Sequence, residues 1–318
     1  MSPRPIIAVI GATGVQGGGL AEAILGGREA PFQLRALTRQ PESKRARELA
    51  ERGAQVVPCD LDDPDSVAAA FEGAHGAFAV TNFWEHFSPE RELAQAYNIA
   101  GAARRSGVKH VVWSTLEDTR LRVPLSDNRM PTLLGRYKVP HLDAKGEADQ
   151  YFRDLPVTYL RTSFYWDNLI RFGMEPQRDS QGGLSFVLPM GDRKLPGISG
   201  ADIGACAYGV FGGGADYVGR TVGIAGEHLT GEEMAQGLSV ALGEPVRHVD
   251  LPHREYAQLQ FPGAADLANM FQYKHDFNAE FRAVRSVEHS RALHPGLRDF
   301  GAWLELNAAS IPRHPAVA

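Results

Sequence analysis

Residues 7–17 read Ile7-Ala8-Val9-Ile10-Gly11-Ala12-Thr13-Gly14-Val15-Gln16-Gly17, an apolar run that ends in three evenly spaced glycines. The run predicts a strand, and the apolar residues after the last glycine predict a helix. In such a unit Gly11 permits the tight turn, Gly14 lets the backbone approach a pyrophosphate, and Gly17 lets helix and strand pack closely. The N–H groups at the helix N-terminus favour an anion. Residues 11–17 are therefore predicted to bind a dinucleotide, and the alternative is an ordinary glycine-rich turn.

The next strand, expected over 32–37, indicates which dinucleotide is preferred. NAD-selective proteins place an acidic residue at the end of this strand, where it binds the ribose hydroxyls. Here the strand is followed by Thr38 and Arg39, with Lys44 shortly after, and no carboxylate stands at the discriminating position to repel a phosphate. Arg39 can form charge-assisted hydrogen bonds to a 2′-phosphate and can stack on adenine. These residues predict NADP(H), and the alternative is a solvated arginine at a strand end.

Composition and charge are those of an ordinary globular protein. The chain has 318 residues, a formal net charge of −5 and two cysteines. The mild charge argues against direct nucleic-acid binding, and neither a signal peptide nor a membrane-spanning run is expected. Two cysteines suit a reducing compartment, so we expect a cytoplasmic protein. The length suggests an NADP-binding Rossmann domain over 1–162 and a smaller domain over 163–318, whose chain can cross back to the sheet.

Strands and helices alternate through the first half of the chain. Helices are expected between strands at 54–57, 76–80, 108–114 and 157–161. This alternation predicts an α/β fold with a Rossmann-type, doubly wound parallel sheet, whose ligands bind beyond the carboxyl ends of the strands. We therefore expect Asp60 and Leu61 to flank the adenine. Along the ribose and nicotinamide we expect Thr81, Asn82 and Phe83. The alternatives are that Asp60 caps the next helix and that Phe83 belongs to the core.

The usual catalytic tyrosine is missing from its expected position. Short-chain dehydrogenases carry Tyr-x-x-x-Lys on one helix face, because the lysine binds the nicotinamide ribose and lowers the pKa of the tyrosine. Lys145 fits the lysine, but the residue four positions earlier is His141. His141 is therefore a candidate proton donor, with capping or packing at the helix start as the alternative. The scattered histidines show no zinc-binding spacing, so we expect no metal site.

Five segments give the chain a family resemblance. They are residues 11–17, 38–41, 81–85, 139–152 and 161–168. In this order they resemble the NmrA-like family, an atypical branch of the short-chain dehydrogenase/reductase superfamily, and in particular its NADP-binding redox-sensor type. The resemblance covers most of the chain.

The resemblance implies an NADP(H)-binding protein with a smaller α+β C-terminal domain that forms a cleft. It adds Tyr165 and Asn168 to the expected cofactor contacts and implies frequent loss of dehydrogenase activity. The function it favours is redox sensing, in which bound NADP(H) controls contact with a partner protein. The alternative is direct hydride transfer from NADPH to a quinone-like or imine-like small molecule. Aromatic residues in 253–281 are expected to line the cleft or to form a core beneath it.

Overall fold

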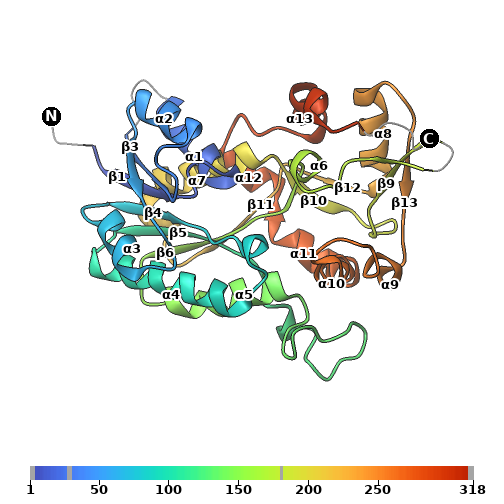
Figure 1. The fold of residues 1–318 in the computed structure, drawn as a ribbon, viewed down its shortest axis with the longest axis horizontal. Coiled ribbons are helices and arrows are strands. Elements are labelled where there is room, and N and C mark those ends of the chain that lie inside the picture. The colour runs from blue at the N-terminus through green and yellow to red at the C-terminus, as the bar shows by residue number, and fades with distance from the viewer. Residues whose placement is uncertain (1–3, 27–30, 180–181, 314–318) are drawn as a thin grey trace.

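The computed structural model describes residues 4–26, 31–179 and 182–313. An eight-stranded sheet with the order β14-β11-β6-β5-β4-β1-β2-β3 forms its centre (Figure 1). All of its strand pairs are parallel. The strands are β1 (Ile6–Ile10), β2 (Gln33–Thr38), β3 (Gln55–Pro58), β4 (Gly76–Ala79), β5 (His110–Thr115), β6 (Val157–Arg161), β11 (Thr221–Ile224) and β14 (Arg285–Ser286). The order 3-2-1-4-5-6 is that of the Rossmann fold, which confirms the predicted class.

Helices cover both faces of this sheet (Figure 1). One face carries α1 (Val15–Gly26), α2 (Lys44–Glu51), α7 (Gly200–Gly213) and α12 (Val287–Leu293). The other face carries α3 (Pro64–Phe71), α4 (Pro89–Arg105) and α5 (Pro140–Ala148). The backbones of α1 and α7 approach closely, since a Cβ built at Gly204 would lie 1.9 Å from the backbone nitrogen of Leu20. The sheet is thereby buried on both faces, as its continuous apolar strands require.

A smaller region packs beside the carboxyl end of the sheet. It has two three-stranded sheets, formed by β7 (Phe164–Tyr165), β10 (Leu195–Ile198) and β12 (Glu227–Leu229), and by β8 (Gln177–Arg178), β9 (Leu184–Val187) and β13 (Val246–Val249). Its helices are α6 (Asn168–Arg171), α8 (Gly231–Leu242), α9 (His253–Tyr256), α10 (Ala264–Asp276), α11 (Asn278–Ala283) and α13 (Phe300–Asn307). Trp166, Phe300 and Trp303 lie in its hydrophobic core. The chain leaves this region to add β11 and β14 to the main sheet.

Helix boundaries follow local capping chemistry. Ser43 accepts a hydrogen bond from the Ala46 amide and caps the start of α2. Helix α5 ends at Ala148 and is followed directly by a 3₁₀ segment, η3 (Asp149–Phe152). In the described part of the chain, no helix has the length and apolar character that crossing a bilayer requires.

Candidate functional site

A cavity of about 1350 Å³ lies along the carboxyl edge of the main sheet and continues into the smaller region. It starts at the turn between β1 and α1, next to the point where the strand order reverses between β1 and β4. The predicted residues that line it are Gly11, Thr13, Gly14, Val15, Gln16, Gly17, Thr38, Arg39, Asp60, Leu61, Thr81, Asn82, Phe83, His141, Lys145, Tyr165 and Asn168. Two predicted residues do not line it. Ala12 is fully buried, and the exposed Lys44 points its ammonium toward Glu48, 3.9 Å away.

The backbone of the glycine turn has the shape that a phosphate-binding loop needs. Gly11 has a φ of +65°, and its carbonyl accepts a hydrogen bond of 2.8 Å from the Gly14 amide. A Cβ at Gly17 would lie 2.4 Å from the Gly11 oxygen, so that position excludes any side chain. The N-terminus of α1 lines the cavity directly beside this turn. Its free N–H groups and dipole make it suited to a pyrophosphate.

Gln16 joins the glycine turn to two other strand ends. Its amide nitrogen donates to the Tyr165 hydroxyl at 2.6 Å, and its amide oxygen accepts from Ser114 at 2.8 Å. The Tyr165 hydroxyl also lies 3.1 Å from the Thr162 hydroxyl. Burial raises the pKa of Tyr165 to about 12, so this phenol is neutral at physiological pH. The turn, β5 and the segment after β6 are thus held in one hydrogen-bonded arrangement at the cavity floor.

Arg39 has a partner that the local sequence does not show. Glu85, in the 3₁₀ segment η1 (Phe83–Glu85), contacts the guanidinium with both carboxylate oxygens, one of them 2.9 Å from Nη2. The expectation that no carboxylate stands near the phosphate-reading position is therefore wrong, since η1 brings one from 46 residues further along the chain. The Arg39 and Glu85 side chains are 55% and 37% exposed, so the ion pair is open to solvent.

Asp60 lies at the cavity and does not cap the next helix. It lines the cavity at the end of β3, and its carboxylate accepts a 3.0 Å hydrogen bond from the Asp62 amide. The cap of α3 is instead Asp63, which accepts from the Asp65 amide. Asp60 therefore shapes its own loop and still faces the cavity.

Lys145 is held by acceptors from two neighbouring elements. Its Nζ lies 2.7 Å from the Thr81 hydroxyl, 3.0 Å from the Thr81 carbonyl and 2.8 Å from Glu92 Oε1. The Thr81 hydroxyl donates to the same carboxylate at 2.6 Å. Glu92 lies on α4, is fully buried and was not predicted as part of the site. One sequence feature could have indicated its burial, since Glu92 shares a helix face with Gln95 and the apolar Ala96. The ion pair fixes the lysine at the cavity wall.

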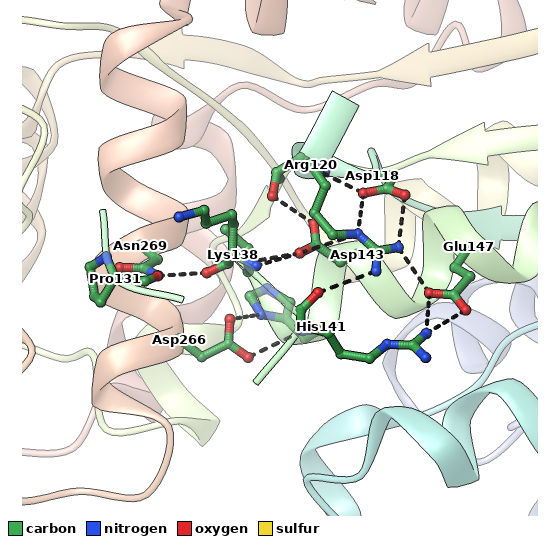
Figure 2. Close-up of polar contacts among 12 residues, drawn as sticks. Asp118, Arg120, Pro131, Lys138, His141, Asp143, Glu147, Asp266 and Asn269 are labelled. Carbon is green, nitrogen blue, oxygen red and sulfur yellow. Dashed lines mark hydrogen bonds and ion pairs between the residues drawn. The ribbon is translucent and has the colours of Figure 1, made fainter. Parts of the chain in front are cut away.

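His141 is oriented by a carboxylate from α10. Its Nδ1 lies 2.7 Å from Asp266 Oδ1, and its backbone amide donates to Asp266 Oδ2 at 3.2 Å (Figure 2). The ring lies 4.6 Å from the Trp84 ring and lines the cavity. Sequence reasoning missed Asp266, which is 125 residues away in the chain. Because Nδ1 is used by Asp266, Nε2 is the ring nitrogen left for other contacts.

Buried polar contacts hold the start of α5 in place (Figure 2). The fully buried Asp143 accepts from the backbone amides of Thr119, Lys138 and Val139 at 2.8 to 3.0 Å. From α10, Asn269 donates to the Lys138 carbonyl at 2.5 Å. The Asp143 bonds fix the start of α5, and the Asn269 bond ties the residues just before α5 to α10.

Many of the side chains that line the far part of the cavity are apolar. They are Trp84, Leu116, Tyr256, Phe261, Leu267, Met270 and Phe281, and Lys274 lines the cavity beside them. Of the aromatic residues expected to line a cleft, Phe271, Tyr273 and Phe277 instead pack in the core of the smaller region. Among the described residues, no group of three potential metal ligands occurs. Cys59 and Cys206 are both buried and unpaired.

Comparison with known proteins identifies the family. The model of the NmrA-like family matches residues 3–304. The chain belongs to the NmrA-like family. It is 28% identical over 307 residues to the NmrA-like oxidoreductase FrzB of Cladobotryum sp., a match that covers 89% of this chain and 88% of FrzB.

Two solved structures of similar fold have different roles. NmrA, a negative transcriptional regulator solved in complex with NADP, has a TM-score of 0.74 at 22% identity, covering 95% of this chain and 94% of its own. The Citrobacter sp. triphenylmethane reductase, complexed with NADP(H), has a TM-score of 0.72 at 21% identity, covering 95% and 99%. Solved structures of this fold therefore include a regulator and a reductase, and the fold alone does not separate the two roles.

Proposed function

We propose that this NmrA-like protein binds NADP(H) along the carboxyl edge of the sheet and reduces a hydrophobic small molecule in the adjoining cavity. The observation that carries the proposal is the continuity of the cavity, which runs from the glycine turn to a wall of aromatic side chains. Its volume of about 1350 Å³ exceeds the range of ~300–1,000 Å³ that is typical of single-ligand pockets. A dinucleotide at the sheet edge would therefore leave room for a second molecule.

The residues present fit NADP(H). The proposed pyrophosphate site is the glycine turn, where a Cβ at Gly17 would collide with the Gly11 carbonyl. Arg39 is the proposed ligand of the 2′-phosphate, which would compete with Glu85 for the guanidinium. Lys145 is proposed to donate to the nicotinamide ribose. The remaining proposed contacts are Thr13, Gly14, Val15, Gln16, Thr38, Asp60, Leu61, Thr81, Asn82, Phe83, Tyr165 and Asn168, all of which line the cavity. Bound NADPH would supply a hydride.

The residues around the proposed hydride site do not form a standard dehydrogenase centre. His141 occupies the tyrosine position, and the Lys145 ammonium is engaged by Glu92 and Thr81. Asp266 holds Nδ1 of His141, which leaves Nε2 as the ring nitrogen that we propose to exchange a proton with the substrate. Acceptors that take up a hydride without simultaneous protonation, such as quinones, depend less on this pair. We therefore propose quinone-like or imine-like acceptors over simple ketones.

The second candidate function is redox sensing. It is supported by the absence of a tyrosine at position 141 and by the regulatory role of NmrA, the NADP-bound structure described above. In that case the cavity would hold an effector, and the redox state of NADP(H) would control contact with a partner protein.

NADPH oxidation measured against a panel of quinones, imines, aldehydes and cationic dyes tests the two functions. If the protein is a reductase, NADPH should be oxidised with at least one apolar acceptor. The Lys145→Met variant should lower this rate, and the exposed control Lys109→Met should leave it unchanged. Tight NADPH binding with no turnover across the panel would refute reduction and favour the sensor.

A further inference from the structure

Lys274 is a buried amine in the wall of the cavity. It lies on α10, its residue is 6% exposed, and it lines the cavity together with Met270 and Phe281. Its Nζ is 3.1 Å from Met270 Sδ and 5.3 Å from the centre of the Phe281 ring. Met270 and Phe281 belong to the core of the smaller region and also line the cavity, so Lys274 lies where this core meets the cavity.

The surroundings of Lys274 differ from those of the other buried lysines. Lys138 donates to two backbone carbonyls at 2.7 and 3.0 Å, and Lys145 is paired with Glu92. The described residues place no carboxylate within 4.0 Å of Lys274 Nζ. An ammonium has three hydrogens to donate, and a thioether is a weak acceptor. The charged form of Lys274 is therefore poorly solvated where it stands.

The nearby charges add to this effect only weakly. Burial, followed by repulsion from Arg285, lowers the pKa of Lys274 to about 7, while Glu117 acts in the opposite direction. Arg285 and Glu117 form a bidentate pair with distances of 2.6 and 2.9 Å, so their net field is small. Tyr273, on the same helix, has a pKa raised to about 12 by burial and stays neutral. A large fraction of Lys274 is therefore the free amine at neutral pH.

We propose that Lys274 is a nucleophilic amine that captures apolar aldehydes or ketones entering the cavity. The Nζ lone pair forms a bond to the carbonyl carbon, the carbon–oxygen bond then breaks, and the oxygen leaves as water with the two protons of the amine. The product is an imine, and hydrolysis reverses the step. No electrons are exchanged and no co-reactant is needed. The wall of Met270, Leu267 and Phe281 selects carbonyl compounds with an apolar or aromatic group.

The reaction can be trapped without NADP(H). The full-length protein is treated at pH 7 with benzaldehyde and sodium cyanoborohydride, and benzylated lysines are quantified by peptide mass spectrometry. At this pH about half of a lysine with a pKa near 7 is unprotonated, against roughly one in a few thousand for an ordinary lysine. Benzaldehyde reaches a buried amine more slowly than an exposed one, which offsets part of this difference. Lys274 should still be labelled at least ~10-fold faster than the exposed Lys44. The buried Lys138, whose amine donates to two backbone carbonyls, should be the slowest.

Two further results are expected. Labelling of Lys274 should rise with a midpoint near pH 7, and the Lys274→Met variant should lose this fast phase alone. Labelling of Lys274 at the rate of Lys44 or slower would overturn the proposal, and this comparison needs only the wild-type protein. Because no nicotinamide is present, the outcome is independent of whether the protein is a reductase.

Discussion

Replacing Glu85 with glutamine should tighten NADPH binding, because Glu85 holds the guanidinium that we assign to the 2′-phosphate. Both carboxylate oxygens contact Arg39, so a phosphate would have to displace them or share the arginine with a second anion. The two side chains are 55% and 37% exposed, and ion pairs of this exposure contribute about 0.2–1 kcal/mol. Freeing Arg39 should therefore improve NADPH affinity by up to about 5-fold. NADH lacks the phosphate and should gain nothing.

Calorimetric titration of NADPH and NADH into three variants measures this effect. Wild-type protein should prefer NADPH by at least ~10-fold, equivalent to ~1.4 kcal/mol, and Arg39→Asp should remove the preference. Glu48→Gln, which removes an exposed glutamate from the adjacent α2, controls for the loss of one negative charge. If Glu85→Gln leaves NADPH affinity unchanged or weakens it, Arg39 does not bind the 2′-phosphate. An equal wild-type affinity for the two cofactors would have the same meaning.

Three further predictions concern buried groups. Lys145→Ala should weaken NADP(H) binding. It should also lower the free energy of unfolding measured in urea by about 3 kcal/mol, since it leaves Glu92 unpaired. Adding Glu92→Gln should restore the stability without restoring binding. His141→Ala should leave cofactor affinity intact and keep the rate of quinone reduction within a few-fold of the wild-type rate. Alcohol dehydrogenase activity is expected to be weak. A sharp fall of that activity in His141→Ala would show that the His141–Asp266 pair supplies its proton. Burial raises the pKa of Asp149 from 3.8 to about 6, so the free energy of unfolding falls by about 3 kcal/mol as pH rises through that interval. The Asp149→Asn variant should therefore be more stable than wild type above about pH 6. Parallel curves of stability against pH for the two proteins would contradict this.

Features encoded in short segments could be predicted from the sequence. Examples are the glycine turn, the alternation of strands and helices, and the position of Lys145. Each of these depends on residues that are close together in the sequence. The structure confirms the Rossmann-type parallel sheet, and the predicted loops meet at one edge because parallel strands place their carboxyl ends together.

Contacts between distant segments could not be predicted in this way. Glu85, Glu92 and Asp266 each neutralise or orient a predicted site residue from 46, 53 and 125 positions away. Each is an acidic residue on a helix, and such residues usually face solvent, so the sequence gives little sign of a role. Lys274 was missed for the same reason, since its burial depends on how α10 packs against α11 and the sheet edge.

Transfer of deuterium from NADPH labelled at the nicotinamide C4 position, the hydride-donating carbon, tests the central claim most directly. Both C4 epimers of the labelled cofactor should be incubated with the protein and an apolar quinone, and the oxidised cofactor should be analysed by mass spectrometry. One epimer should lose its label while the other keeps it in the oxidised cofactor, and quinone and NADPH should be consumed in equal amounts. NADPH that binds tightly but stays unoxidised with every acceptor of the panel would contradict the proposed reduction and leave the cavity as an effector site.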